Sequence, residues 1–198
     1  MAKVKLTKNE LKNQKDMLKR FQRYLPTLIL KKQQLQMVMR QVEAKVREQK
    51  RAQAEARDAM DAWIAVFGED IDVAQYIKIQ SLRTSTGNIA GIDIPVFEEL
   101  RFEPSDHDLY ATPPWVDAGI EALCRLLSFD AEIAVLEEQL RLLENELRIT
   151  TQRVNLFEKI KIPEAKENIR QIRIYLGDQQ TAAVVRGKIA KNKVEQVS

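Results

Sequence analysis

The residues best suited to chemistry form the short run Asp106-His107-Asp108, which contains the only histidine of the chain. An imidazole flanked by carboxylates has the parts of a general base or of a metal ligand. A metal site or an acid–base pair needs further ligands or a nucleophile at a defined spacing. The sequence has no second histidine, no cysteine cluster and no partner at such a spacing, so a solvated loop is the preferred interpretation.

Two other candidates also have simpler explanations. The glycine-containing stretch Gly87 to Gly91 lacks the Gly-Lys-Ser/Thr ending and the following helix of a phosphate loop, so a turn explains it better. Cys124, the only cysteine, lies in an apolar stretch, where a free thiol packs as a small hydrophobe. We therefore predict no catalytic residue, no cofactor, no metal site and no internal disulfide.

Composition points away from a compact enzyme. The chain has 198 residues, of which 31% are charged, and only six glycines and six prolines. No run of about 18 apolar residues occurs, and the first ten residues are polar and lysine-rich. We expect a soluble, cytoplasmic protein without membrane insertion.

The elements that carry these residues are dominated by a long heptad pattern in the first third of the chain. Apolar residues recur seven apart in two interleaved series, as they do in a coiled coil. The series are Leu11, Leu18, Leu25, Met39, Val46, Met60 and Phe67, and Phe21, Leu28, Leu35, Val42, Ala56 and Trp63. The pattern predicts one long helix up to Phe67.

A second heptad pattern begins near Asp117. Its two series are Ile133, Leu140, Leu147 and Val154, and Leu136, Leu143, Thr150 and Phe157. Past Pro163 the apolar stripe resumes one residue out of step, as Ile169, Ile172, Leu176, Ala183 and Ala190. We predict a second long helix whose seam is locally rewound near Pro163.

The centre of the chain concentrates glycine and proline and loses the helical pattern. Residues 76–79 and 92–97 alternate like short strands, residues 85–88 are typical of a turn, and Pro95 favours an edge strand. We predict a mainly α protein, in which an antiparallel two-helix coiled coil (residues 1–67 and 117–198) carries a small central β-hairpin module (residues 68–116).

Charge supports pairing of the two helices with each other. If the chain folds back at its centre, residues whose numbers add up to about 190 lie side by side. Basic residues of the first helix then face acidic ones of the second: Lys45, Arg47, Lys50, Arg51 and Arg57 against Glu132, Glu137, Glu138, Glu144 and Glu146. The same register places Pro26 beside Pro163 and predicts a shared kink.

The end formed by the two termini is different, because basic residues from both helices meet there and repel one another. They include Lys12, Lys19, Arg20, Lys159, Lys161, Lys166, Arg170, Arg173, Arg186, Lys188, Lys191 and Lys193. Glu98, Glu99, Glu103, Asp106 and Asp108 make the central module acidic instead. An uncompensated basic end predicts an acidic partner surface.

Several motifs carry a resemblance to a known family. Arg153-Val154-Asn155-Leu156, with Glu158 and Ile162-Pro163, resembles the C-terminal helix of the D subunit of V-type (archaeal and bacterial) ATP synthases. Gly91-Ile92-x-Ile94-Pro95 is similar to that family's hairpin return, and Leu25-Pro26-Thr27-Leu28 resembles its bacterial branch. The stretch from Gly177 to Val185 departs from the charged sequence of many relatives.

The resemblance implies a non-catalytic central-stalk rotor protein that couples ATP turnover to rotation of a membrane ring. It implies contacts with the catalytic A and B subunits, with the F subunit and with the C subunit, at the cytoplasmic face of the membrane. The residues expected to contact the hexamer are Lys12, Lys19, Arg20, Lys166, Arg170, Arg173 and Arg186. The residues expected in the seam are Leu18, Phe21, Leu25, Leu28, Leu140, Leu147, Val154 and Phe157.

Two other functions fit parts of the pattern. A prefoldin-like chaperone also joins two long helices through β-hairpins, and it would assemble into a hexamer and suppress aggregation. A nucleic-acid-binding coiled coil would use the basic end, but that end lacks interleaved aromatic residues and a recognised reading motif. We therefore expect no nucleic acid among the partners.

Overall fold

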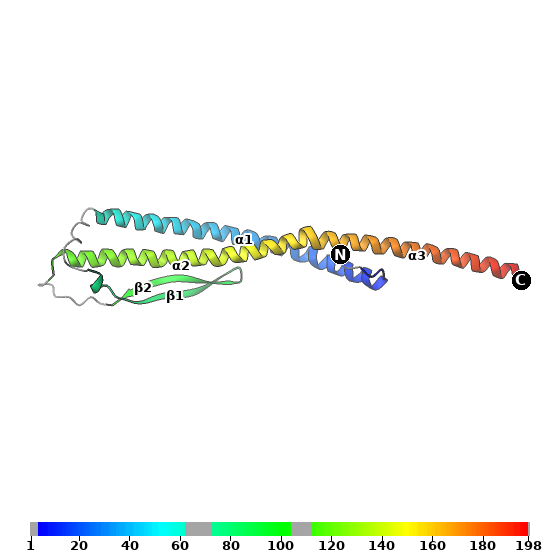
Figure 1. Cartoon of the computed structure of the whole chain (residues 1–198), viewed down its shortest axis with the longest axis horizontal. Coiled ribbons are helices and arrows are strands. Elements are labelled where there is room, and N and C mark those ends of the chain that lie inside the picture. The colour runs from blue at the N-terminus through cyan, green and yellow to red at the C-terminus, as the bar shows by residue number, and fades with distance from the viewer. Residues whose placement is uncertain (1–3, 62–72, 104–111, 198) are drawn as a thin grey trace. The chain divides into compact units, whose positions relative to one another are not determined.

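The computed structural model describes residues 4–61, 73–103 and 112–197. Its elements, in chain order, are α1 (Lys8–Asp61), a 3₁₀ turn η2 (Val73–Tyr76), β1 (Ile79–Ile89), β2 (Ile92–Phe102), α2 (Trp115–Asn155), a π-helical turn η3 (Leu156–Lys161) and α3 (Ile162–Val197). The predicted mainly α fold with a small two-stranded hairpin is confirmed (Figure 1). The boundary expected at residues 67 and 68 falls outside the described residues, so the three-segment division stays a prediction.

The chain forms two compact units, which we describe separately: Met1–Lys32 with Ile149–Ser198, and Gln33–Arg148. α1 begins behind a capping residue, because the Thr7 hydroxyl oxygen accepts a hydrogen bond of 3.2 Å from the Glu10 backbone N–H. This bond satisfies one of the donors that the first turn of a helix leaves free. The helix therefore begins at Lys8, directly after the capping residue Thr7.

The unit of residues 33–148 is held by the heptad seam between α1 and α2. Its buried cluster consists of Leu35, Val42, Val46, Leu136 and Leu143. Polar side chains fix the register beside this seam. Lys50 forms an ion pair of 2.7 Å with Glu137, Gln49 donates to Glu132 at 3.0 Å, and Gln53 donates to Asp130.

Of the predicted charge pattern, the pair Lys50–Glu137 joins the two helices. Arg51 instead pairs with Glu55 in its own helix, and Glu138 pairs with Arg141. Neighbours three or four residues apart on a helix are always within reach, so they compete with partners across the seam. The ion pair and the hydrogen bonds between α1 and α2 nevertheless join the two helices in an antiparallel register.

The unit of the two termini pairs the start of α1 with the end of the chain. The Phe21 and Phe157 rings lie 5.2 Å apart, and Asn168 donates a hydrogen bond of 3.4 Å to Gln14. The expected twin-proline level is wrong. Phe21 lies opposite Phe157, and the two helices run antiparallel. Pro26, five residues after Phe21, therefore lies at the level of about Gln152, which is on the far side of Phe157 from Pro163.

The one-residue shift of the apolar stripe has a structural cause in η3. The Ile162 N–H bonds to the Phe157 carbonyl, five residues back, so this turn holds one residue more than an α-helical turn. Pro163 follows directly and has no N–H to offer to the preceding turn. The buried positions therefore move from Val154 before the turn to Ala165, Ile169 and Ile172 after it.

The hairpin turn lies later than predicted. Residues 85–88 belong to β1, and the chain reverses at Ala90 and Gly91, whose φ angles are 53° and 81°. Two positive φ angles define the two-residue turn that matches the twist of paired strands. The Asn88 side chain supports it by accepting the Gly91 N–H at 3.2 Å and donating to Asp93 at 2.7 Å. Of residues 76–79, which were predicted as a strand, only Ile79 belongs to one, since the 3₁₀ turn extends to Tyr76 and β1 starts at Ile79.

Candidate functional site: surfaces for partners

The described residues contain no group of three or more His, Cys, Asp or Glu side chains that could hold a metal ion. Asp106, His107 and Asp108 lie outside those residues, so their solvated-loop interpretation stays a prediction. Cys124 is half-buried at the α2 surface, and burial raises the pKa of its thiol. The described residues present three surfaces, which we take in turn.

The first surface is the basic end of the unit formed by the two termini. All seven expected contact residues are exposed: Lys12, Lys19, Arg20, Lys166, Arg170, Arg173 and Arg186. Arg170, however, is bound by both carboxylate oxygens of Glu167, at 2.8 and 2.9 Å. This bidentate contact lowers the pKa of Glu167 and raises that of Arg170.

The expectation that this basic end cannot neutralise itself is thus partly wrong. Besides Arg170, Lys161 pairs with Glu164 at 3.0 Å and Lys191 pairs with Glu195 at 3.5 Å, each within the C-terminal helical stretch. These pairs were readable from the sequence, because the acids stand three or four residues from the bases. Of the seven expected contact residues, the other six form no ion pair within the described part of the chain.

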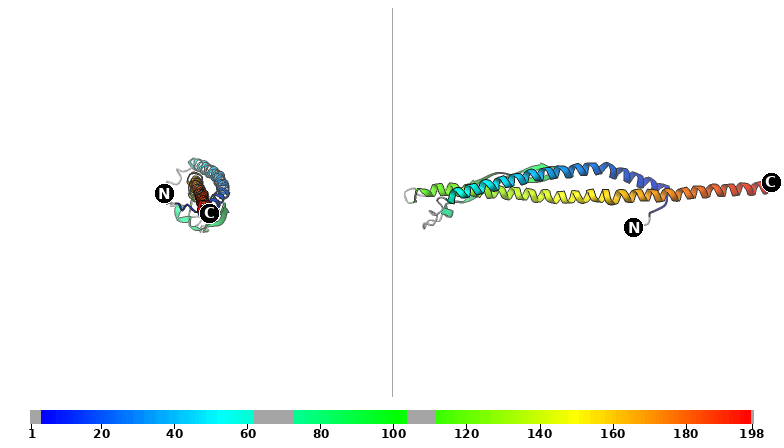
Figure 2. Two further views of the ribbon diagram at one scale, coloured as in Figure 1. Left: turned by 90° about the vertical axis from the view of Figure 1, so that its right-hand side faces the viewer. Right: turned by 90° about the horizontal axis from the view of Figure 1, so that it is seen from above.

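The second surface is the C-terminal stretch of α3. Ile172 is the last fully buried residue, and beyond it the helix continues to Val197 with apolar side chains in solvent. Figures 1 and 2 show this stretch running past the N-terminal end of α1, within the same unit. The exposed apolar residues are Ile174, Tyr175, Val184, Val185, Ile189 and Val194. A helix with such a surface suits a protein environment better than water.

The third surface is the hairpin, which is docked on the helices through a polar contact that sequence reasoning missed. Gln139 of α2 is only 6% exposed, and its side-chain amide donates a hydrogen bond of 2.5 Å to the Pro95 carbonyl of β2. Ile89, Ala90 and Ile92 add apolar contacts to the core cluster. No local pattern marks Gln139, because its partner lies 44 residues earlier in the chain.

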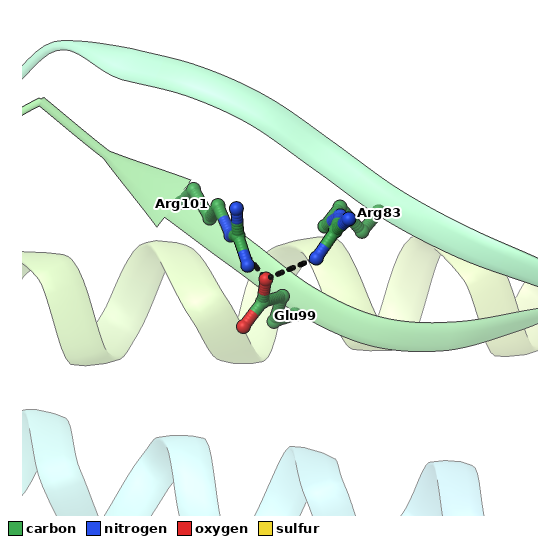
Figure 3. Close-up of polar contacts among 3 residues, drawn as sticks. All are labelled: Arg83, Glu99 and Arg101. Atoms are coloured by element: carbon green, nitrogen blue, oxygen red, sulfur yellow. Dashed lines mark hydrogen bonds and ion pairs between the residues drawn. The ribbon is translucent and has the colours of Figure 1, made fainter.

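The hairpin also carries a charged cluster (Figure 3). Glu99 of β2 accepts hydrogen bonds from Arg101 and, across the strands, from Arg83 at 3.2 Å. The hydrogen bond from Arg101 lowers the pKa of Glu99 most, and the one from Arg83 lowers it further. Two guanidinium groups on one carboxylate make this cluster basic, whereas the described residues of the module, 73–103, hold four acidic and three basic side chains.

The eight expected seam residues lie along the two helical pairings. Val154 is buried, and Leu18, Phe21, Leu25, Leu28, Leu140, Leu147 and Phe157 are half-buried. Pro26 is exposed inside α1, and Pro163 is exposed in the first turn of α3. Within the described residues, no helix is long and apolar enough to cross a lipid bilayer.

Comparison with known proteins identifies the chain. The family model for the D subunit of ATP synthase matches residues 10–192. A V-type ATP synthase D subunit of Borreliella burgdorferi is 50% identical over 194 residues, covering 98% of this chain and 96% of the relative. The D subunits of Chlamydia pneumoniae and Chlamydia muridarum are 35% and 34% identical, each covering at least 97% of this chain and 93% of the relative. The resemblance noted from the motifs is confirmed, and the chain belongs to the D-subunit family of V-type ATP synthases.

Proposed function

We propose that this chain is the central-stalk rotor subunit of a V-type ATP synthase. In this role it couples ATP turnover in the catalytic hexamer to rotation of the membrane ring, and it catalyses no reaction itself. The observation that carries the proposal is the uncovered C-terminal stretch of α3 in a chain that matches the D-subunit family over nearly its whole length. Membership in that family favours the rotor over the chaperone alternative.

A helical pair is suited to this work for physical reasons. The seam and its cross-links resist relative sliding of α1 and α2, because sliding would break the Lys50–Glu137 and Gln49–Glu132 contacts and expose the buried cluster. An asymmetric helix surface, in turn, presents a different face to each interface of a surrounding ring. Such differential contacts are what allow a rotation to bias the state of each interface.

The partners within the complex follow from the same proposal. The A and B subunits surround the exposed stretch of α3, the F subunit lies alongside, and the C subunit binds the unit of residues 33–148. The protein then works at the cytoplasmic face of the membrane without entering it and without binding nucleic acid. The cations that form no ion pair within the described ranges, among them Lys166, Arg173 and Arg186, make contacts with acidic residues of the hexamer.

The test is a triple variant, Lys166→Gln, Arg173→Gln and Arg186→Gln, in the reconstituted complex. Arg170 is left unchanged because Glu167 already neutralises it. We expect ATP hydrolysis to persist while ion pumping or rotation weakens, with a dependence on salt smaller than that of the parent complex. Arg141→Gln is the matched control, since Arg141 is already paired with Glu138. Unchanged coupling in the triple variant would refute the proposed contacts.

A further inference from the structure

The turn of the hairpin determines which backbone groups of β1 face β2. In a two-residue turn, the flanking residues form a hydrogen-bonded pair, so Ile89 and Ile92 exchange both of their bonds. Hydrogen-bonded and non-hydrogen-bonded pairs then alternate along the ladder. The pair Thr86–Pro95 is therefore non-hydrogen-bonded, which agrees with the missing N–H of proline.

The same alternation turns the backbone N–H and C=O groups of Thr84, Thr86 and Asn88 away from β2. They form the free edge of the hairpin, which we call the β1 edge. No backbone hydrogen bond outside the ladder engages these three residues in the described ranges. Exposed side chains accompany them along β1, from Ile79 to Thr86.

The opposite edge of the hairpin is covered. The Pro95 carbonyl points out of β2 and is bound by Gln139 of α2, and the neighbouring Ile94 is only 3% exposed. β2 accordingly lies between α2 and β1 (Figures 1 and 3). The sheet has one protected edge and one open edge.

The open edge lacks the usual defences against pairing. Proteins protect such edges with lysine, proline, bulges or very short strands. β1 is 11 residues long and contains no proline and one charged residue, Arg83, which Glu99 holds across the ladder. Its register irregularities lie at Ile79/Ser81 and Arg83/Thr84, which leaves the edge from Thr84 to Ile89 regular.

We propose that the β1 edge pairs with an extended strand of another subunit of the V-type ATP synthase, so that the hairpin becomes a three-stranded sheet. Backbone bonds to Thr84, Thr86 and Asn88 supply the binding, and the uncharged side chains around them tolerate many partner sequences. The Arg83–Glu99–Arg101 cluster carries one net positive charge. An acidic residue of the partner strand next to Arg83 therefore sets the register.

A second copy of the chain is a poorer occupant. If two β1 edges paired antiparallel about Thr86, Arg83 of each copy would face Ile89 of the other. That arrangement offers no acid to the basic cluster. The proposal rests on membership in the complex and on the proposed function, but it concerns a different part of the molecule from the basic end.

Amide hydrogen exchange tests the proposal residue by residue. In the isolated full chain, we expect the amides of Thr84, Thr86 and Asn88 to exchange faster than those of Ser85, Gly87 and Ile89, which face β2. In the assembled complex, exchange of the first three should slow by about tenfold or more, because they acquire hydrogen bonds. Exchange at those three amides that is equally fast in the free chain and the complex would overturn the proposal.

Substitution of Thr86 supplies the second test. Thr86→Pro removes one edge N–H without removing a bond to β2, whereas Thr86→Val keeps the N–H and the shape of the side chain. We expect Thr86→Pro to reduce protection of the remaining edge amides in the complex several-fold, and Thr86→Val to leave it unchanged. Equal effects of the two substitutions would show that the backbone is not what is bound.

Two further outcomes separate the alternatives. Concentration-dependent dimerisation of the isolated chain with protected edge amides would replace the other subunit by a second copy and overturn the proposal. A chain that fails to enter the complex at all refutes the proposed function, whereas a chain that enters it with an unprotected edge refutes only the pairing.

Discussion

The π-helical turn η3 gives the sharpest prediction, because it holds one residue more than the heptad pattern requires. We consider deletion of Lys159, an exposed residue inside it. Without that residue, an uninterrupted α-helix carries Val154 and Ile169 on the same seam, and each buried side chain keeps its place. In a Pro163→Ala background, which removes the clash of a proline inside a regular α-helix, the free energy of unfolding should change by no more than about 1 kcal/mol, the size of one hydrogen bond.

Insertion of one alanine between Lys159 and Ile160 is the matched control. A second extra residue has no turn to absorb it, so Ile169 and Ile172, which are 7% and 0% exposed, rotate out of the seam. Exposing two such side chains costs about 3 to 6 kcal/mol. For a chain of this size, that loss lowers the melting temperature by roughly 6 °C or more.

Urea unfolding and thermal melts followed by circular dichroism measure both variants against the parent chain. The reasoning requires a marked asymmetry between deletion and insertion. If removal of Lys159 destabilises the chain as much as the added alanine does, η3 is not the device that corrects the register, and the explanation of the shifted stripe fails.

Four further predictions concern single side chains. Leu143→Ala should lower the free energy of unfolding by about 2 to 5 kcal/mol, since Leu143 is fully buried in the α1–α2 cluster, and urea titration measures it. Gln139→Leu leaves the Pro95 carbonyl without its partner at a cost of about 1 to 3 kcal/mol, which should appear as faster amide exchange in β2. The Cys124 thiol should react with maleimide at pH 7 more slowly than free cysteine and speed up at alkaline pH, because its pKa is raised. The lowered pKa of Glu99 means that its pairing stabilises the hairpin above the ordinary carboxyl pKa and is lost as the pH falls through the lowered value, so Glu99→Gln should be less stable than the parent near neutral pH and equal to it in acid.

The helices were predictable because their information is local and repeated. The heptad series identified α1, α2 and the shifted stripe after Pro163, since each buried residue has another seven positions away. The local structure that produces this shift was not predictable, because a helix can accommodate one extra residue in several ways. Here a wide turn absorbs the extra residue; it directly precedes Pro163 and contains Phe157, whose ring lies against that of Phe21.

The hairpin shows the opposite case. The composition of residues 85–88 is typical of a turn, yet they form strand because Ile89 and Ile92 beyond them pack against the helical core. Tertiary packing outweighs the local preference. This packing places Ala90 at a positive φ angle, a conformation that favours glycine. Gln139, which fixes the hairpin on α2, depends on a long-range contact and has no local signature at all.

The uncovered stretch of α3 also bears on the life of the protein before assembly. A single helix without a packed face is only marginally stable in water, so we expect the subunits of the proposed complex to stabilise it. Newly made chains therefore expose a protease-accessible tail that contains Arg186, Lys188 and Lys191, each a cleavage site for trypsin-like enzymes. In the proposed role, other subunits cover this tail on assembly, so we expect limited proteolysis to cut the free chain faster than the assembled one.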